Sequence, residues 1–180
     1  LSRSDIIGAA IPGDVRFVDT NGDGVLNSDD QDFIGSAQPD FQGGLTNTVN
    51  YKGFELSAFL QFVYGNEIYN NAQGFYGHYG YNYNHWDRAT NAWTPENTDT
   101  NVPRASWFDS NQNTRTSDFL VYDGSYMRLK SATVAYNFTA EQLSTIGLRS
   151  LRIYATGQNL VTWTSYPGLD PEINTFDGSN

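Results

Sequence analysis

Two consecutive segments of eleven residues alternate between apolar and polar side chains, and this pattern limits the possible folds more than any other feature. They are Phe41–Tyr51 and Phe54–Tyr64, joined by the dipeptide Lys52-Gly53. A period of two places every second side chain on one face of a strand, and a two-residue connection containing Gly is typical of a tight hairpin. The sequence therefore predicts a hairpin of two long antiparallel strands.

The length of these strands is compatible with two architectures. Tilted strands of about 9–11 residues cross the hydrocarbon of a membrane in β-barrels, with aromatic residues at both interfaces. Strands of soluble β-sandwiches are usually shorter, about 5–6 residues. The apolar face is interrupted only at Gly43 and Asn47, and aromatic residues stand at the strand ends. The pattern alone leaves the transmembrane barrel and the soluble sandwich both open.

Composition supports an ordered β-rich chain and excludes several classes of function. Charged residues make up 17% of the chain and aromatic residues 15%, which argues against disorder. The net charge of −10 would repel nucleic acid, and without cysteine there is no disulfide or thiolate site. No run reaches the ~18 apolar residues of a transmembrane helix. Because the first residues lack an initiator Met and a signal-peptide pattern, we expect the chain to be an excerpt.

Two further long strands are expected near the end of the chain. One runs through YMRLKSATVAYNF to residue 138, and the other through RSLRIYATGQNLVTWTSY. Between them Thr139 and Gln142 have the spacing of a capping box, which predicts a short helix that ends at Gly147. This helix would fill the turn between the two strands.

The acidic segment DTNGDGVLNSDD has the spacing of a twelve-residue calcium loop. Oxygen ligands would converge on one point because Gly24, at the sixth position, permits the sharp turn. A helical turn should follow, with Ser28 or Asp29 as its N-cap and Gly35 as its end. The alternative is an acidic turn stabilised by its own side chains, without a metal. The predicted ligands of a structural Ca²⁺ are Asp19, Asn21, Asp23, Val25 (through its backbone carbonyl), Asn27 and Asp30.

Residues 65–117 form a long polar segment in which apolar periodicity fades, so we expect a functional or interaction loop. Within it HWDRATNAW could form a short helix, and Thr94-Pro95-Glu96 has the pattern of an N-cap followed by Pro at the first helical position. Its aromatic residues among Asn and Asp suit stacking on carbohydrate, or else packing of the loop on itself. The candidate contacts for substrate or partner are Tyr79, Tyr81, Tyr83, Trp86 and Trp93.

Catalytic residues are not predicted. The only histidines, His78 and His85, both fall in this aromatic segment, and no hydrolase, metalloprotease or nucleotide-binding motif occurs. Nothing in the spacing of the twenty acidic residues favours a particular carboxylate pair. The chain is therefore not expected to be an enzyme.

In combination these segments resemble the C-terminal part of SusC/RagA-like TonB-dependent outer-membrane transporters. The resemblance extends from about Pro12 to Glu172. It is carried, in order, by the DTNGDG loop with the hairpin that follows, by WTPENTDTNVPRAS, by DGSYMRLKSATVAYNF, and by GQNLVTW followed by GLDPE. It implies a large barrel of about 22 strands with a plug domain. It also implies energisation by TonB, and a SusD-like surface lipoprotein that helps to capture oligosaccharides or peptides.

The fold class expected on this basis is all-β: an incomplete antiparallel transmembrane barrel segment of about four long strands, with long extracellular loops and short helices. The layout would be an extracellular calcium-loop segment (1–40), a strand hairpin (41–64), a long extracellular loop (65–117), two strands with a periplasmic helical turn (118–165) and an extracellular loop (166–180). Since four strands cannot close a barrel, the chain would be a fragment of a multi-pass protein of the outer membrane. The alternative function is a soluble calcium-stabilised β module that binds carbohydrate or a partner.

The resemblance also assigns the two faces of the strands. The lipid would be faced by Phe41, Leu45, Val49, Phe54, Leu56, Leu60, Phe62, Val134, Tyr136 and Phe138. The lumen would be faced by Thr46, Thr48, Asn50, Ser57 and Gln61.

Overall fold

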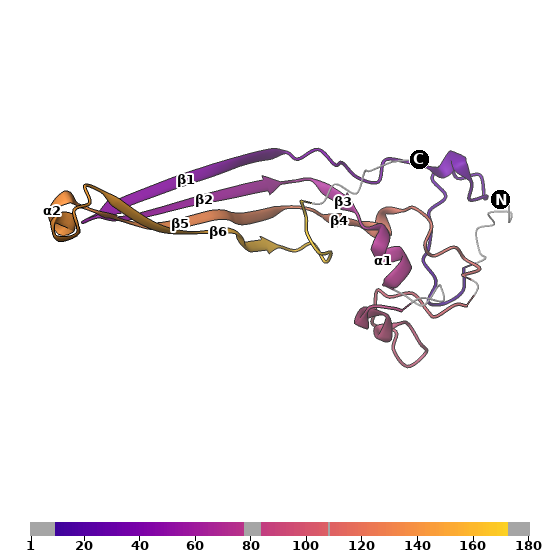
Figure 1. Cartoon of the computed structure of the whole chain (residues 1–180). Coiled ribbons are helices and arrows are strands. Elements are labelled where there is room, and N and C mark those ends of the chain that lie inside the picture. Colours follow the sequence, from indigo (N-terminus) through magenta and orange to yellow (C-terminus); the bar gives the residue numbers. More distant parts are fainter. Residues whose placement is uncertain (1–9, 78–83, 108, 173–180) are drawn as a thin grey trace, which may run out of the picture. The chain divides into compact units, whose positions relative to one another are not determined.

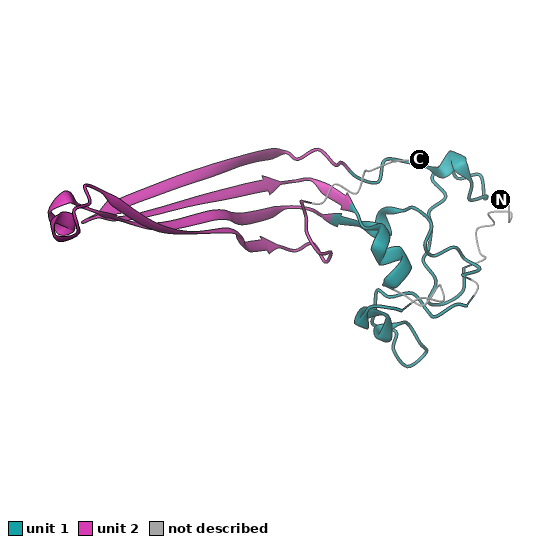
Figure 2. Ribbon diagram, in the orientation of Figure 1, with its two compact units in different colours: residues 1–35, 69–122 teal, residues 36–68, 123–180 magenta. Residues whose placement is uncertain are grey.

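The computed structural model describes residues 10–77, 84–107 and 109–172, and the chain divides into two compact units. One unit consists of residues 1–35 and 69–122, and the other of residues 36–68 and 123–180 (Figure 2). Each unit is therefore built from two stretches that are distant in the sequence. None of the helices in these described ranges is long and apolar enough to cross a membrane.

The second unit contains a four-stranded antiparallel sheet in the order β1-β2-β5-β6 (Figure 1). The strands are β1 (Phe41–Tyr51), β2 (Phe54–Tyr64), β5 (Tyr126–Phe138) and β6 (Leu151–Thr164). A separate two-stranded sheet pairs β3 (Glu67–Tyr69) with β4 (Val121–Asp123). The predicted all-β segment of four long strands with a few short helices is confirmed.

Local sequence chemistry explains both turns of the large sheet. Lys52 and Gly53 connect β1 to β2 with φ angles of 47° and 88°, the left-handed values that a type I′ hairpin turn requires at both central positions. Between β5 and β6 lie α2 (Ala140–Leu143) and η4 (Ser144–Ile146). The backbone N–H of Thr139 donates to the side chain of Gln142 at 2.9 Å, and the reciprocal bond completes the predicted capping box. Gly147 ends the turn with φ 71°.

The first unit has little regular structure. Its elements are η1 (Ser28–Asp30), α1 (Asn71–Tyr76), η2 (Asp87–Asn91) and η3 (Asp118–Leu120). Leu120 is fully buried and lies 3.3 Å from the position that a side chain would take at Gly74 of α1, so glycine lets the helix pack closely on Leu120. The segment 65–117, expected as a loop, therefore contains short helices, including the one predicted within HWDRATNAW.

Two expected helix boundaries were wrong. The helical turn after the acidic loop has Asn27 as its N-cap, because the backbone N–H of Asn27 donates to Asp30 at 2.8 Å and closes a capping box. It ends at Asp30, well before Gly35, because the backbone of Gln31 is extended. No helix begins at Thr94. Instead Thr94 and Asn97 exchange two backbone hydrogen bonds, of 3.2 and 3.0 Å, which close a tight turn.

Candidate functional site

The sheet of the second unit has one apolar face and one polar face. Residues that lie opposite each other on neighbouring strands share a face, and the register pairs Leu45 with Leu60 and Leu60 with Leu129. The residues predicted to face lipid all fall on this apolar face in the observed register: Phe41, Leu45, Val49, Phe54, Leu56, Leu60, Phe62, Val134, Tyr136 and Phe138.

The apolar face is exposed on all four strands. Leu45 is 58% exposed on β1, Leu56 50% on β2, Val134 53% on β5 and Ile153 58% on β6. Water-soluble proteins rarely expose a contiguous apolar surface of this extent. This face therefore requires an apolar environment or a partner.

The polar face is held by side-chain hydrogen bonds and ion pairs between strands. Thr133 of β5 and Thr156 of β6 have hydroxyl oxygens 2.9 Å apart. Arg152 of β6 reaches Glu55 of β2 at 3.0 Å, and the intervening Ala135 of β5 is buried. The residues predicted to face a lumen share this face: Thr46, Thr48, Asn50, Ser57 and Gln61.

A β-bulge in β5 changes which residues of that strand lie on each face. The register shifts where Phe59 pairs with Ser131 and Leu60 with Leu129, so Lys130 is the extra residue. Without the shift, Arg128 would share the apolar face with Val134. With it, Arg128 lies opposite Gln61 on the polar face. Sequence reasoning missed the bulge, although two cations at alternate positions of an otherwise apolar run are a usable signal for it.

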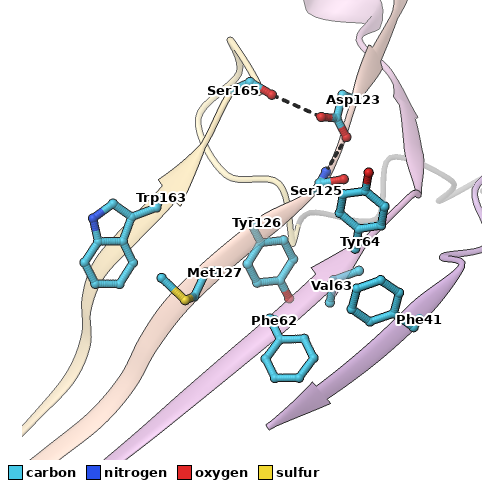
Figure 3. A pocket seen from close by; sticks show the side chains of 10 residues that line it. All are labelled: Phe41, Phe62, Val63, Tyr64, Asp123, Ser125, Tyr126, Met127, Trp163 and Ser165. Carbon is cyan, nitrogen blue, oxygen red and sulfur yellow. Dashed lines mark hydrogen bonds between the residues drawn. The ribbon is translucent and has the colours of Figure 1, made fainter. Parts of the chain in front are cut away.

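Aromatic side chains line a hollow at the start of β1 and the end of β2 (Figure 3). Phe41 stacks on Tyr64 with ring centroids 5.2 Å apart. The polar edge of this hollow is Asp123, which accepts hydrogen bonds from the backbone N–H of Ser125 at 2.8 Å and from Ser165 at 3.3 Å. The side chain and backbone N–H of Ser125 lower the pKa of Asp123 below its usual value. An apolar aromatic surface with an anionic rim results, lined also by Phe62, Met127 and Trp163.

The acidic loop of the first unit is folded by its own side chains. Asp19 accepts backbone N–H groups from Gly22 at 2.7 Å and from Gly24 at 3.0 Å, and Gly24 has φ 88°. Asp23 likewise accepts from Val25 at 2.8 Å. These bonds close the tight turns of the loop around Gly22 and Gly24.

Asp30 closes the loop on the opposite side. Its carboxylate accepts backbone N–H groups from Thr20 and from Asn27, each at 2.8 Å. The pKa of Asp30 is lowered, chiefly because Asn27 donates to it, which favours the anionic form. Within the described ranges, however, no group of three or more His, Cys, Asp or Glu side chains is arranged as a metal site. The calcium ligands Asp19, Asn21, Asp23, Val25, Asn27 and Asp30 stay a prediction that rests on spacing and on the turn geometry.

The predicted aromatic contacts have different surroundings. Tyr79, Tyr81 and Tyr83 lie outside the described residues. Trp86 is 39% exposed, and its ring lies 5.8 Å from that of Tyr76, which is 40% exposed.

Trp93, by contrast, packs within its own unit. A side chain at Gly13 would lie only 2.5 Å from the Trp93 ring, and the backbone N–H of Trp93 donates to Val102 at 3.0 Å. Trp93 therefore stabilises its loop, whereas Trp86 keeps aromatic surface available. Trp107, 75% exposed, is an aromatic side chain that sequence reasoning missed.

A buried polar network that the sequence did not reveal joins residues near 14 to residues near 110 in this unit. Asn113, 1% exposed, accepts the backbone N–H of Val15 at 2.8 Å. Asp14 forms an ion pair with Arg104 at 2.8 Å. Asp109 accepts the backbone N–H of Asn113 at 2.9 Å. This network fixes the chain just before the acidic loop.

Comparison with known proteins places these features in context. No family model matches the chain. Over 173 residues, or 96% of the chain, it is 39% identical to TonB-dependent receptor P3 of Formosa agariphila, and it is 35% identical to receptor P26 of the same organism over 92%. It is 28% identical to TonB-dependent receptor SusC of Bacteroides thetaiotaomicron over 94%. The chain spans about a sixth of the length of these curated relatives, 17% for P3.

Solved structures give the same result. The match to the RagAB peptide importer in its closed-closed state covers 89% of this chain and 18% of the importer chain, with a TM-score of 0.63 and 26% identity. Another structure of the RagAB peptide transporter covers 76% of the chain and 15% of its own, with a TM-score of 0.58. The resemblance read from the sequence is therefore confirmed.

Proposed function

We propose, from the premise that this chain is a SusC/RagA-like segment of a TonB-dependent receptor, that it forms four adjacent strands of a barrel that imports nutrients across the outer membrane. The observation that carries the proposal is the exposed apolar face, which runs across β1, β2, β5 and β6 and is backed by a polar face. In a barrel the apolar face would contact lipid and the polar face would line the lumen.

The dimensions of the strands support this assignment. β1 and β2 each contain 11 residues, a length of about 34 Å at ~3.4 Å per residue. Tilted by about 40–45°, such a strand spans ~25 Å along the membrane normal, the height of the apolar band of outer-membrane barrels. Aromatic residues at the strand ends, such as Phe41 and Tyr51, would lie at the two interfaces.

The connections give the orientation. Short turns of outer-membrane barrels face the periplasm and long loops face outward. Lys52-Gly53 and the α2–η4 turn are the short connections, so they would be periplasmic. The acidic loop segment, residues 65–117 and residues 166–180 would then be extracellular, where substrate and partner are met.

The partners proposed are a SusD-like surface lipoprotein, TonB acting through another part of the receptor, and an oligosaccharide or peptide as cargo. SusC and the RagAB peptide importer are the relatives that support this proposal. We assign no catalytic step to the chain.

Calcium is proposed as a structural ion of the acidic loop. Asp19→Ala combined with Asp23→Ala should abolish calcium binding measured by calorimetry on the whole receptor and leave barrel insertion intact. Asp29→Asn is the matched control, since Asp29 lies in the same loop outside the predicted ligand set. Unchanged calcium affinity in the double variant would refute the ligand assignment.

The second candidate is a soluble calcium-stabilised β module that binds carbohydrate or a partner. It is supported by the fold of the acidic loop and by the exposed ring of Trp86. It is opposed by the apolar face, which water would solvate poorly across all four strands.

The decisive test is fractionation of the source cells with an antibody against this segment. We expect a band several times larger than this chain in the outer membrane, with the shift on boiling that is characteristic of β-barrels. A soluble band of the chain's own size would refute the transporter and favour the soluble module.

A further inference from the structure

Four charged side chains meet on the polar face near the bulge of β5. Arg128 donates to Glu172 at 2.7 Å and also to Asp170. Lys130 donates to both carboxylate oxygens of Glu172 at 2.7 Å. Two cations of one strand thus bind two carboxylates that follow it by about forty residues in the sequence.

Burial makes these contacts necessary. The side chain of Arg128 is only 4% exposed, whereas those of Asp170 and Glu172 are each 37% exposed. A buried cation is costly unless anions and hydrogen-bond acceptors compensate it. The aromatic ring of Tyr126, 5.3 Å from the guanidinium, adds a cation–π contact, and Nε of Arg128 has no acceptor in the described part of the chain. The carboxylates therefore supply most of the compensation.

The bulge is what makes this site possible. It turns Arg128 toward the polar face, and it lets Lys130, two residues away, reach the same carboxylate. A bulge interrupts the hydrogen bonding of the sheet and is a feature that re-aims side chains. Two adjacent cations would also repel each other if no anion lay between them.

The segment that supplies the carboxylates has a defined shape. After β6 ends at Thr164, a side chain at Gly168 would clash with the ring of Tyr166, so the segment folds tightly there. The backbone N–H of Glu172 donates to Asp170 at 2.8 Å and fixes the two acidic residues together. Leu169 is fully exposed. Residues 166–172 are called the strap below.

We infer that Arg128 and Lys130 form a carboxylate-binding site on the polar face, and that the chain's own Asp170 and Glu172 occupy it and latch the strap to the wall of the barrel. The inference rests on the proposed function, because only in a barrel does the polar face line a lumen. The strap then lies against the polar face at the extracellular end of β5, and its release would widen the mouth of the passage on this side.

The test uses the whole receptor with Leu169→Cys carrying a nitroxide label, since this segment contains no cysteine of its own. Electron paramagnetic resonance reports the ratio of mobile to immobile label, which measures release of the strap. Arg128→Gln combined with Lys130→Gln removes both cations that β5 contributes to the latch. Asp170→Asn with Glu172→Gln empties the strap side and leaves β5 unaltered, so its effect is not a failure of the strand to fold.

We expect either double variant to raise the mobile-to-immobile ratio by about tenfold or more, since one charge-assisted hydrogen bond is enough to change an equilibrium constant by that factor. Arg152→Gln is the matched control, because it removes a cation of the same face that is paired with Glu55 instead. A barrel that assembles normally but shows an unchanged ratio in both double variants, or the same rise with Arg152→Gln, overturns the latch alone. Failure of the unaltered receptor to form a heat-modifiable barrel overturns the proposed function and the latch with it.

Discussion

The proposed lipid face can be tested by placing a charge at different depths along one strand. Leu45 is near the middle of β1, on the apolar face and 58% exposed, and Thr46 is the next residue, on the polar face. Tyr51 shares the apolar face with Leu45 but ends the strand. Substitution of each by Arg in the whole receptor compares two faces at one depth, and two depths on one face.

The expected magnitudes follow from the geometry. Leu45 is six residues from Tyr51, about 20 Å along the strand and ~15 Å along the membrane normal at a tilt of about 40°. This places Leu45 near the middle of an apolar band of ~25 Å, where Arg costs about 2–4 kcal/mol, whereas the cost near the interface is ~0–1 kcal/mol. Leu45→Arg should therefore destabilise the barrel by about 2–4 kcal/mol, Tyr51→Arg by at most ~1 kcal/mol, and Thr46→Arg by little.

The assay is reversible folding of the receptor into lipid vesicles across a denaturant series, with the folded fraction measured by heat-modifiability on gels. Equal costs for Leu45→Arg and Thr46→Arg would refute the face assignment. Equal costs for Leu45→Arg and Tyr51→Arg would instead refute the depth argument. In lipid the cost of Arg depends on its distance from the membrane midplane, whereas a protein partner that covered this face would impose no such dependence.

Three further predictions concern the sheet itself. Deletion of Lys130 removes the extra residue of the bulge and leaves Arg128 opposite Gln61 by ordinary alternation, so the assembly yield should stay close to that of Lys130→Gln; a large difference between the two yields would contradict the assigned register. Gly53→Ala should destabilise the barrel by about 1–2 kcal/mol in the same folding assay, because Gly53 has φ 88° and a side chain there would lie 3.0 Å from the carbonyl of Asn137. Thr139→Ala removes the capping box of α2 and should cost ~1 kcal/mol, whereas Thr139→Ser should cost much less; equal losses would mean that the cap is not formed.

Features that depend on residues close in the sequence were predictable from the sequence. Alternation with a period of two determined the length of β1 and β2 and the composition of their faces. The Lys52-Gly53 turn and the capping box of Thr139 with Gln142 form within a few residues, through backbone angles and hydrogen bonds that those residue types prefer. The turns of the acidic loop have the same local origin.

The tertiary structure decided what depends on pairing between distant segments. β2 and β5 are neighbours although residues 65–125 separate them, and no local preference encodes that pairing. The bulge at Lys130 exists only relative to the strands beside it, so alternation in β5 alone gives the wrong face for Arg128. The contacts of the strap could not be predicted from the sequence either. The partners of Arg128 lie about forty residues away in the sequence and reach it only once the register of β5 and β6 is fixed.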